Sequence, residues 1–220
     1  MDFLALSHPQ QDHTAGLVFL ARCFQPAELW TSGQESELPA WQRLLSACGE
    51  NGARVFDVRD LAAGREVSGV RVEALHPPPD YPARFSPDDD PNQYSLVLRL
   101  SLGKRAVLLP GDLTGKGERE LCKNAAGRMA SDVVVGPHHG SSRSSGVAFI
   151  KAADPSVVIF SAGRGNSFGF PRPSAVARYR ARGCEVFSTP GDGAVRVETD
   201  GEELFVWGLS GEARAWEAPP

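Results

Sequence analysis

The sequence predicts an α/β protein in which a sandwich of mixed sheets carries helices on its outside. Two patterns lead to this fold class. Short apolar runs with the composition of buried strands alternate with helix-like segments along the chain. Hairpin patterns occur among them, so parallel and antiparallel pairing are expected together. With 220 residues the chain can bury the core of one sizeable domain, which we expect to span residues 1–209.

The first half of the chain alternates strand and helix patterns. Apolar runs bounded by glycine, proline or polar residues predict strands at 2–6, 28–32, 53–58 and 69–77. Helices are expected at 14–24, which has an apolar face, and at 38–52, which glycine ends. Residues 77–92 are rich in proline and contain three consecutive aspartates, so we expect an exposed loop there.

The second half begins with the clearest hairpin, at 94–112, where two β-rich runs flank Leu-Gly-Lys. The remaining segments of strand type lie at 131–137, at 156–163 and, as three strands, within 184–208. A helix with a basic face is expected at 173–183. We expect the tail, 210–220, to be loose.

Composition excludes some classes of protein. The net charge of -4 and the pI of about 5.8 give no global attraction to nucleic acid, so such contact needs a local basic patch. The four cysteines are widely spaced and form no CxxC pair, which predicts reduced thiols. The sequence has no apolar run of about 18 residues and no signal-peptide pattern at its start. These features predict a soluble chain from a reducing compartment.

Imidazole and carboxylate groups gather where predicted strands end. They belong to His8, Asp12, His13, Asp112, His138 and His139. Zn²⁺ and Mn²⁺ bind such nitrogen and oxygen atoms at about 2.0–2.2 Å, and sites are often built from loops at the edge of a rigid sheet. A lone histidine is more often a surface or core residue, and we interpret His76 in that way. The six residues together predict a metal site.

Five motifs make the chain resemble the metallo-β-lactamase-fold domain at the C-terminal end of the ComEC family of bacterial DNA-uptake proteins. The family patterns are SHPDxDHxGGL, NxxSLVLxL with LLTGD, DVLKVxHHGSxxSS, SxGxxNxYGHP and TxxxGAIxV. Their counterparts here are SHPQQDHTAGL, NQYSLVLRL with AVLLPGDL, DVVVGPHHGSSRSS, SAGRGNSFGFP and TPGDGAVRV. The resemblance runs from about residue 3 to residue 207.

The resemblance implies an αββα fold and a metal-dependent hydrolase, a phosphodiesterase or nuclease acting on DNA during uptake. The implied cofactor is one or two divalent metal ions, Zn²⁺ or Mn²⁺, held by the six residues above. Asp112 would bridge, and Asp12 would orient the attacking water. Asp12 and Asp112 are therefore the expected catalytic residues.

Residues beside these ligands are expected to contact the substrate. The hydroxyls of Ser141, Ser142 and Ser144 are expected either to bind a phosphate oxygen or to cap their loop, and Asn166 to lie at the cleft rim. Arginines in and after these loops either contact phosphates or, on 173–183, form a solvated face. The implied partners are single-stranded DNA and the membrane channel portion of a longer protein of the family, which attaches the domain to the inner membrane.

Three departures from the family pattern limit these implications. Gln10 replaces an aspartate, and a neutral amide oxygen is a poorer ligand for a divalent cation. Phe170 replaces a histidine and can neither bind a metal nor transfer a proton. We therefore expect one well-held ion, bound by Asp12, His13, Asp112 and one of the paired histidines. The family's first strands, with DVGQGD and DTG elements, have no counterpart, so we expect the domain to be truncated at its N-terminus.

Two alternatives stay open at the level of the sequence. The chain could be a degenerate module that binds DNA or a channel partner without catalysis. It could also be another hydrolase of the same fold, acting on small phosphodiesters or esters.

Overall fold

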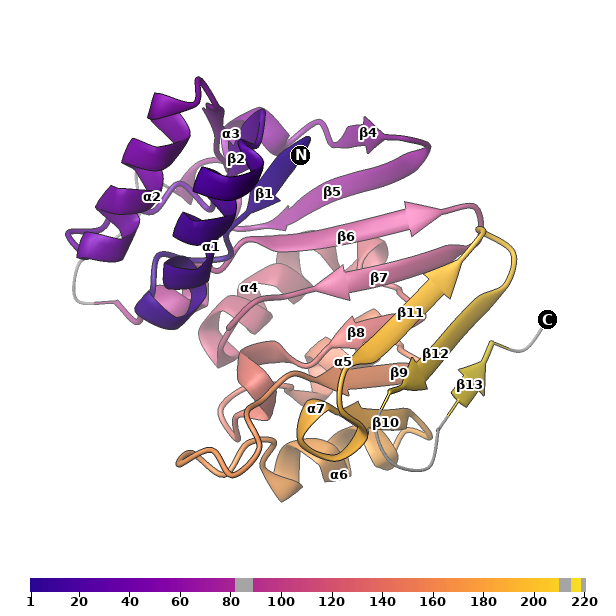
Figure 1. Ribbon diagram of the computed structural model, residues 1–220. Helices are drawn as coiled ribbons and strands as arrows, with labels where there is room; N and C mark the ends of the chain where they lie inside the picture. The colour runs from indigo at the N-terminus through magenta and orange to yellow at the C-terminus, as the bar shows by residue number, and fades with distance from the viewer. Residues whose placement is uncertain (82–88, 210–214, 219–220) are drawn as a thin grey trace.

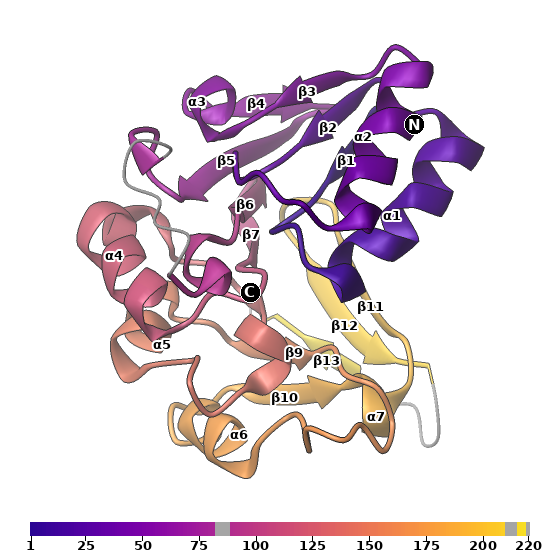
Figure 2. The ribbon, with the colours of Figure 1, turned by 90° about the vertical axis from the view of Figure 1, so that its left-hand side faces the viewer.

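The computed structural model describes residues 1–81, 89–209 and 215–218. In this part of the chain the elements form four layers: helices, a β layer, a central sheet and a second group of helices (Figures 1 and 2). The predicted α/β class and its αββα layering are confirmed.

The central sheet has seven strands in the order β10-β9-β8-β7-β6-β5-β4. Pairing is antiparallel from β4 to β7 and parallel from β7 to β10, so the sheet is mixed as expected. The strands are β4 (Arg65–Val67), β5 (Val70–His76), β6 (Val97–Leu102), β7 (Arg105–Leu109), β8 (Val133–Val135), β9 (Val157–Phe160) and β10 (Glu185–Ser188).

Two three-stranded sheets form the other β layer and pack on one face of the central sheet. One is parallel and contains β1 (Phe3–Ala5), β2 (Glu28–Trp30) and β3 (Arg54–Phe56). The other is antiparallel and contains β11 (Val195–Thr199), β12 (Leu204–Gly208) and β13 (Ala215–Glu217). Trp30 packs with Leu98 of the central sheet, and Leu204 packs with Val157.

Helices cover both outer faces. Helices α1 (Gln11–Phe24) and α2 (Pro39–Glu50) enclose a core with β1 and β2, whereas α4 (Gly115–Ala125), α5 (Val147–Ala153) and α6 (Pro173–Arg180) cover the free face of the central sheet (Figure 2). Short helical turns are α3 (Val58–Leu61), α7 (Thr189–Asp192), η2 (Pro91–Tyr94), η3 (Ala126–Arg128) and η4 (Pro137–Gly140). Among the described helices, none combines the length and apolar character that crossing a membrane requires.

All the predicted strands are present, with slightly shorter bounds, but some helices differ from expectation. Helix α1 begins three residues before the predicted start, because the Gln10 carbonyl already accepts hydrogen bonds from the backbone N–H groups of His13 and Thr14. Helices α4 and α5 were not predicted. The first turn of α4 holds two glycines, which lower helix propensity, and its burial against the central sheet compensates.

The tail was expected to be loose, and this is corrected for residues 215–217, which form β13. Trp216 pairs with Val206 of β12 and packs against the core between the two β layers. An apolar side chain buried in this way offsets the entropy cost of ordering the segment. The predicted loop at 77–92 falls in part on residues 82–88, outside the described residues.

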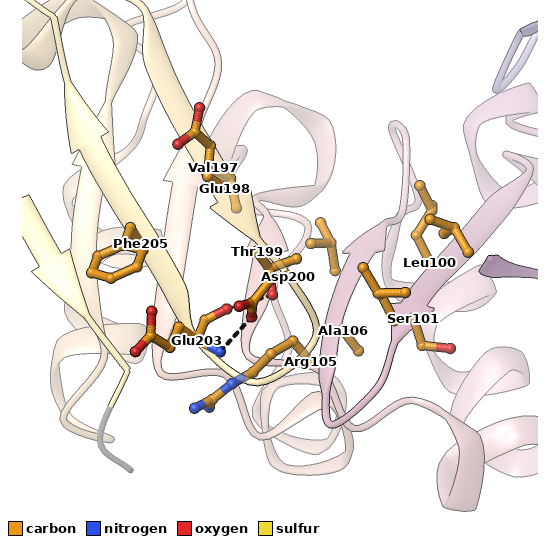
Figure 3. A pocket seen from close by; sticks show the side chains of 13 residues that line it. Leu100, Ser101, Arg105, Ala106, Val197, Glu198, Thr199, Asp200, Glu203 and Phe205 are labelled. Carbon is orange, nitrogen blue, oxygen red and sulfur yellow. Dashed lines mark hydrogen bonds between the residues drawn. The ribbon is translucent and has the colours of Figure 1, made fainter. Parts of the chain in front are cut away.

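A hollow of about 650 Å³ lies between the central sheet and the β11–β12 hairpin (Figure 3). Leu100 and Ala106 line it from one side, and Val197 and Phe205 line it from the other. Within the described residues β1 pairs only with β2, and β11 only with β12, so each of these strands has one open edge.

Glu28 on β2 connects the first sheet to the edge of the central sheet. Its carboxylate accepts hydrogen bonds from Trp30 Nε1 at 2.8 Å, from Arg54 Nη2 at 2.8 Å and from Arg65 Nη2 at 3.0 Å. Burial by itself would raise the pKa of Glu28, but these three donors outweigh it and lower the pKa. A lowered folded-state pKa means that the contribution to stability is present above the unfolded pKa and is lost as pH falls through the folded value.

We expect Glu28→Gln to lower the free energy of unfolding at pH 7 by about 1–2 kcal/mol, because charge-assisted hydrogen bonds are replaced by neutral ones. Below pH 4.5, the ordinary pKa of this carboxyl, stability is expected to fall less steeply in the variant than in the parent protein. Urea unfolding across pH 3–7 measures both effects. The exposed Glu37→Gln is the matched control, and parallel pH profiles for Glu28→Gln and the parent would contradict this account.

Candidate metal centre

The first group of predicted ligands lies where β1 leads into α1. His8 is in the connecting loop, and Asp12 and His13 are in the first turn of the helix. The loop is tight, because the backbone N–H of Gln10 donates to the carbonyl of His8 at 2.9 Å. The rings of His8 and His13 consequently lie 4.4 Å apart between centroids. His8 and His13, which are five residues apart in the sequence, therefore lie close together in space.

Asp112 is brought to these histidines by the turn after β7. Gly111 has a φ of 57°, and a Cβ atom on it would lie 2.6 Å from Ser7 Cβ. Only glycine tolerates both that backbone conformation and that approach. The neighbouring chain is fixed as well, since the backbone N–H of Leu96 donates to the Ser7 carbonyl at 2.7 Å. Gly111 thus allows the β7 turn to lie directly against the His8 loop.

The paired histidines follow β8 in the turn η4, and both have left-handed backbone conformations. The φ angles are 50° at His138 and 55° at His139. Non-glycine residues in such conformations cost of order 1–3 kcal/mol each and are concentrated at functional sites. The turn is held by the backbone N–H of His138, which donates to the Gly111 carbonyl at 3.0 Å. This bond connects the β8 turn to the β7 turn.

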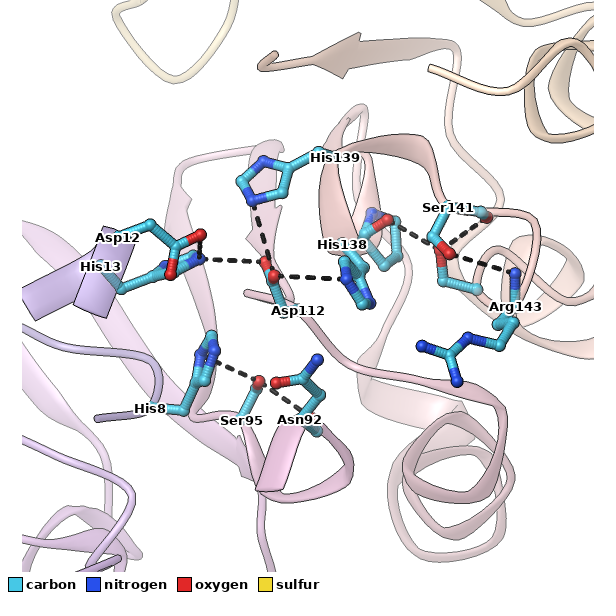
Figure 4. Close-up of polar contacts among 12 residues, drawn as sticks. His8, Asp12, His13, Asn92, Ser95, Asp112, His138, His139, Ser141 and Arg143 are labelled. Carbon is cyan, nitrogen blue, oxygen red and sulfur yellow. Dashed lines mark hydrogen bonds and ion pairs between the residues drawn. The ribbon is translucent and has the colours of Figure 1, made fainter. Parts of the chain in front are cut away.

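The Asp112 carboxylate lies at the centre of the cluster (Figure 4). Its Oδ1 is 3.4 Å from His13 Nε2, and its Oδ2 is 3.5 Å from His139 Nε2 and 3.8 Å from His138 Nε2. Asp12 approaches from the cleft side, with Oδ2 3.8 Å from His13 Nε2. Three segments far apart in the sequence therefore converge on one carboxylate.

Several ring nitrogens are left free to bind a cation. His8 Nε2 and His13 Nε2 are buried and have no hydrogen-bond partner among the described residues. His139 Nδ1 donates to the Ser161 carbonyl at 2.8 Å, which leaves its Nε2 unprotonated in the neutral ring. Two overlapping sets have donor atoms within 4.8 Å of one another: His8, His13 and Asp112, and Asp12, His13 and His139. Buried unpartnered imidazole nitrogens facing a carboxylate fit a divalent cation.

The protonation states of His8, His138 and Asp112 agree with this donor set. Burial lowers the pKa of His8 to about 4, so its imidazole is neutral at pH 7. Burial also lowers the pKa of His138. At His13 burial acts in the same direction, but the Asp112 carboxylate outweighs it and raises the pKa. Burial opposes the ionisation of Asp112, but the nearby imidazoles of His13 and His139 outweigh it and lower the pKa of the carboxyl. Neutral imidazoles and an ionised carboxylate are the forms that bind metal.

A cleft of about 450 Å³ opens onto this cluster. Asp12, Asp112 and His139 contribute to its wall, and so do Gln10 and Phe170, the two residues that depart from the family pattern. His76 lies elsewhere in the fold. It is buried, and its Nε2 donates to the Gln93 carbonyl at 2.8 Å.

The predicted substrate-binding residues have different surroundings. Ser141 lines the cleft, whereas the exposed Ser142 lines a separate hollow. The Ser144 hydroxyl is buried and donates within its own loop, to the carbonyls of Pro137 and Ser141. Asn166 lines the cleft, but its side chain bonds to the backbone of its own loop. Of the two roles expected for the serines, Ser144 has contacts of the loop-capping kind.

Two residues support the serine-rich loop: Glu118 was missed at the sequence level, and Arg178 was expected either to contact phosphates or to lie on a solvated face. The buried Glu118 on α4 accepts hydrogen bonds from the backbone N–H groups of Ser145 and Gly146. Arg178 on α6 donates to the carbonyls of Ser144 and Ser145 at 2.7 and 2.8 Å. Arg178 is therefore engaged in the fold rather than lying on a solvated face. No sequence motif signals that Glu118 holds this loop. The one hint is that a glutamate on the buried side of α4 has no other use.

We expect Glu118→Gln to destabilise the protein by about 1–3 kcal/mol, because one of the two loop N–H groups would face an amide NH₂ instead of an oxygen. The loop that follows His139 would lose its fixed position. Thermal unfolding of this variant, beside the exposed Glu35→Gln control, measures the loss of stability. A stability equal to that of the control would show that the loop does not depend on Glu118.

Sequence comparisons place the chain among competence proteins. It is 30% identical over 196 residues to "Competence protein ComA" of Neisseria gonorrhoeae, covering 89% of this chain and 25% of that protein. It is 27% identical over 198 residues to "ComE operon protein 3" of Bacillus subtilis, covering 89% and 24%. The chain thus spans about a quarter of the length of these relatives. No family model matches the chain.

A solved structure shares the fold. A variant of CmlA β-hydroxylase superposes with a TM-score of 0.54 at 14% identity, over 86% of this chain and 43% of that one. The metallo-β-lactamase fold protein YhfI from Bacillus subtilis has a TM-score of 0.49 at 12% identity, over 99% and 78%. Together with the four layers and the five sequence motifs, the domain-length matches show that the chain resembles the metallo-β-lactamase-fold domain of ComEC-type competence proteins.

Proposed function

We propose that this domain is a metal-dependent phosphodiesterase that cleaves a nucleic-acid strand. The observation that carries the proposal is the position of Asp112, whose two oxygens face three imidazole nitrogens at 3.4–3.8 Å on the floor of a cleft. Hydrolysis of a phosphodiester needs charge stabilisation at the phosphoryl group and a positioned water. The cleft offers residues for both tasks.

The donor set suits one divalent ion better than two. Asp12, His13, Asp112 and His139 form one continuous group of donors. A second ion near His8 would have to share His13, whose single free Nε2 can bind only one ion, and Gln10 adds no charge there. When bound, Zn²⁺ or Mn²⁺ supplies Lewis-acid chemistry, polarising a phosphoryl oxygen and making water a better nucleophile.

The chain's own residues supply orientation and proton transfer. The Asp12 side chain is 69% exposed at the cleft, so its carboxylate can accept a hydrogen bond from the attacking water and take up its proton. Arg143 is exposed in the same wall and can pair with a non-bridging phosphate oxygen. The Ser141 hydroxyl lies beside Arg143, whose backbone N–H donates to it at 3.3 Å. These groups hold the phosphodiester over the floor of the cleft.

DNA is the substrate that the competence relatives favour, with uptake as its context. The chain carries a net charge of -4, so binding relies on local positive charge. Arg143, Arg164 and Arg172 are exposed in or beside the loops of the cleft and provide it. Because the relatives are about four times as long as the match, the membrane channel portion of a longer protein is the partner we propose.

A non-catalytic binding module is the second candidate. The observation that favours it is the presence of Gln10 and Phe170 in the wall of the cleft, since neither carries an imidazole or a carboxylate. Fewer ligands weaken metal retention, and the same cleft could then hold a strand without cutting it. Cleavage assays separate the two functions.

Metal analysis of the purified protein is expected to give one equivalent of Mn²⁺ or Zn²⁺ per chain. His139→Ala is expected to reduce bound metal more than His138→Ala, because only His139 shares a donor group with Asp12 and His13. Elemental analysis after gel filtration measures the stoichiometry. Two equivalents at full occupancy would overturn the single-ion assignment.

Cleavage of single-stranded DNA is expected to require added Mn²⁺ and to fall by at least about 100-fold in His13→Ala, since lost transition-state charge stabilisation is typically of that size. The exposed Lys123→Ala on α4 serves as the matched control and is expected to cut at the parent rate. Gel assays with labelled oligonucleotides give the rates. Binding without cleavage by the parent protein would instead support the non-catalytic module.

A further inference from the structure

Two phenylalanines form an aromatic wall at the mouth of the cleft. Phe168 and Phe170 are stacked, with ring centroids 5.4 Å apart and an interplanar angle of 16°. Phe168 is 65% exposed, as are other large apolar side chains such as Phe19 at 64%, but Phe168 is exposed at the cleft. Both residues line the same cleft as Asp112 and His139. Exposing apolar surface to water costs free energy. A contact between these rings and a bound ligand would remove that surface from water.

The wall continues into the metal centre. The Phe170 ring is stacked against His139 at 6.3 Å between centroids and meets His138 edge-on at 5.8 Å. The order Phe168, Phe170, His139 therefore runs from the exposed rim to the donor group. A ring bound on Phe168 would lie beside a phosphate held over Asp112.

Hydrogen bonds hold this wall in place before any substrate binds. Asn166 Nδ2 donates to the carbonyls of Gly163 and Phe170, both at 2.8 Å, and its Oδ1 accepts from the backbone N–H of Phe170 at 2.8 Å. The backbone N–H of Arg172 donates to the carbonyl of Gly140 at 2.9 Å, which ties the aromatic loop to the histidine turn. A fixed aromatic face loses little entropy when a partner stacks on it.

Charge around the wall indicates what kind of ring binds there. Arg143 and Ser141 also line this cleft and suit a phosphate. A ligand that joins an aromatic ring to a phosphodiester by a short linker is a nucleotide, and successive bases of single strands stack on aromatic side chains without sequence preference. A duplex would keep its bases stacked on one another and could not use this wall.

We propose that Phe168, backed by Phe170, is a stacking platform for a nucleobase of a single-stranded substrate, next to the phosphodiester at the metal centre. This inference rests on the proposed action on a single nucleic-acid strand and adds the residue that would contact a base of that strand. Phe168 is a binding residue in it, and its contact is with the base rather than with the reacting atoms.

The test is a binding experiment that does not depend on turnover. A single-stranded DNA oligonucleotide carrying 2-aminopurine is mixed with the protein by stopped flow, and a strand of equal length with abasic sites throughout is measured by competition. Phe168→Ala is expected to weaken binding of the base-bearing strand about 5- to 100-fold, the loss of one aromatic stack. Binding of the abasic strand is expected to stay as in the parent, and Phe168→Trp is expected to restore the difference between the strands.

Phe24→Ala is the matched control. Phe24 is also exposed, at 53%, but lies at the far end of α1, about 16 Å along the helix from His13. If Phe168→Ala does not fold, Phe168→Leu keeps apolar bulk without an aromatic face and is expected to show the same loss. Circular dichroism melting of each variant establishes folding.

The outcomes separate the platform from the proposed hydrolysis. Equal loss for both strands would show a structural role for Phe168, and no loss would show that bases do not stack there; either result overturns the platform. Hydrolysis of the base-bearing strand by the parent protein is followed in parallel. Selective loss without any hydrolysis supports the platform and rejects the hydrolase, whereas hydrolysis without selective loss does the reverse.

Discussion

The buried carboxylate of Asp112 is the group on which the rest of the site depends. It is 3% exposed, and an ionised carboxylate at that depth is stable only when oppositely polarised groups surround it. The imidazoles that surround it come from the β1–α1 loop and the β8 turn, so the charge can be satisfied only if the layers pack as they do. Gly111 makes this possible by letting the β7 turn touch Ser7. The packing of the layers and the geometry of the site therefore depend on each other.

Around this centre, polar groups of the scaffold orient each ligand. Ser7 lies 3.0 Å from His8 Nδ1, and the Ser161 carbonyl holds His139 Nδ1. Farther from Asp112, Glu118 on α4 and Arg178 on α6 hold the serine-rich loop through hydrogen bonds to its backbone. Bonds of this kind set the direction of ligands and so decide affinity and reactivity. The precision of the centre comes from these supports as much as from the ligands.

The two replacements in the cleft have a common interpretation. Phe170 occupies a place where the family pattern has an imidazole, and it stacks on His139 rather than binding a cation. The loss of ligands favours a single ion, while the gain of an aromatic face extends the wall begun by Phe168. Both residues of the wall belong to the cleft that also contains Asp112 and His139.

The sequence by itself determined the fold class, the strands and the six candidate ligands, because apolar runs and motifs can be recognised within short stretches of the chain. It did not reveal α4, α5 or β13, which are stabilised by packing against the sheets. Only the tertiary structure decided which imidazoles face Asp112, that Ser144 caps its loop, and that Phe168 stacks beside the cleft. These are contacts between segments far apart along the chain, and such distances are set by packing rather than by spacing.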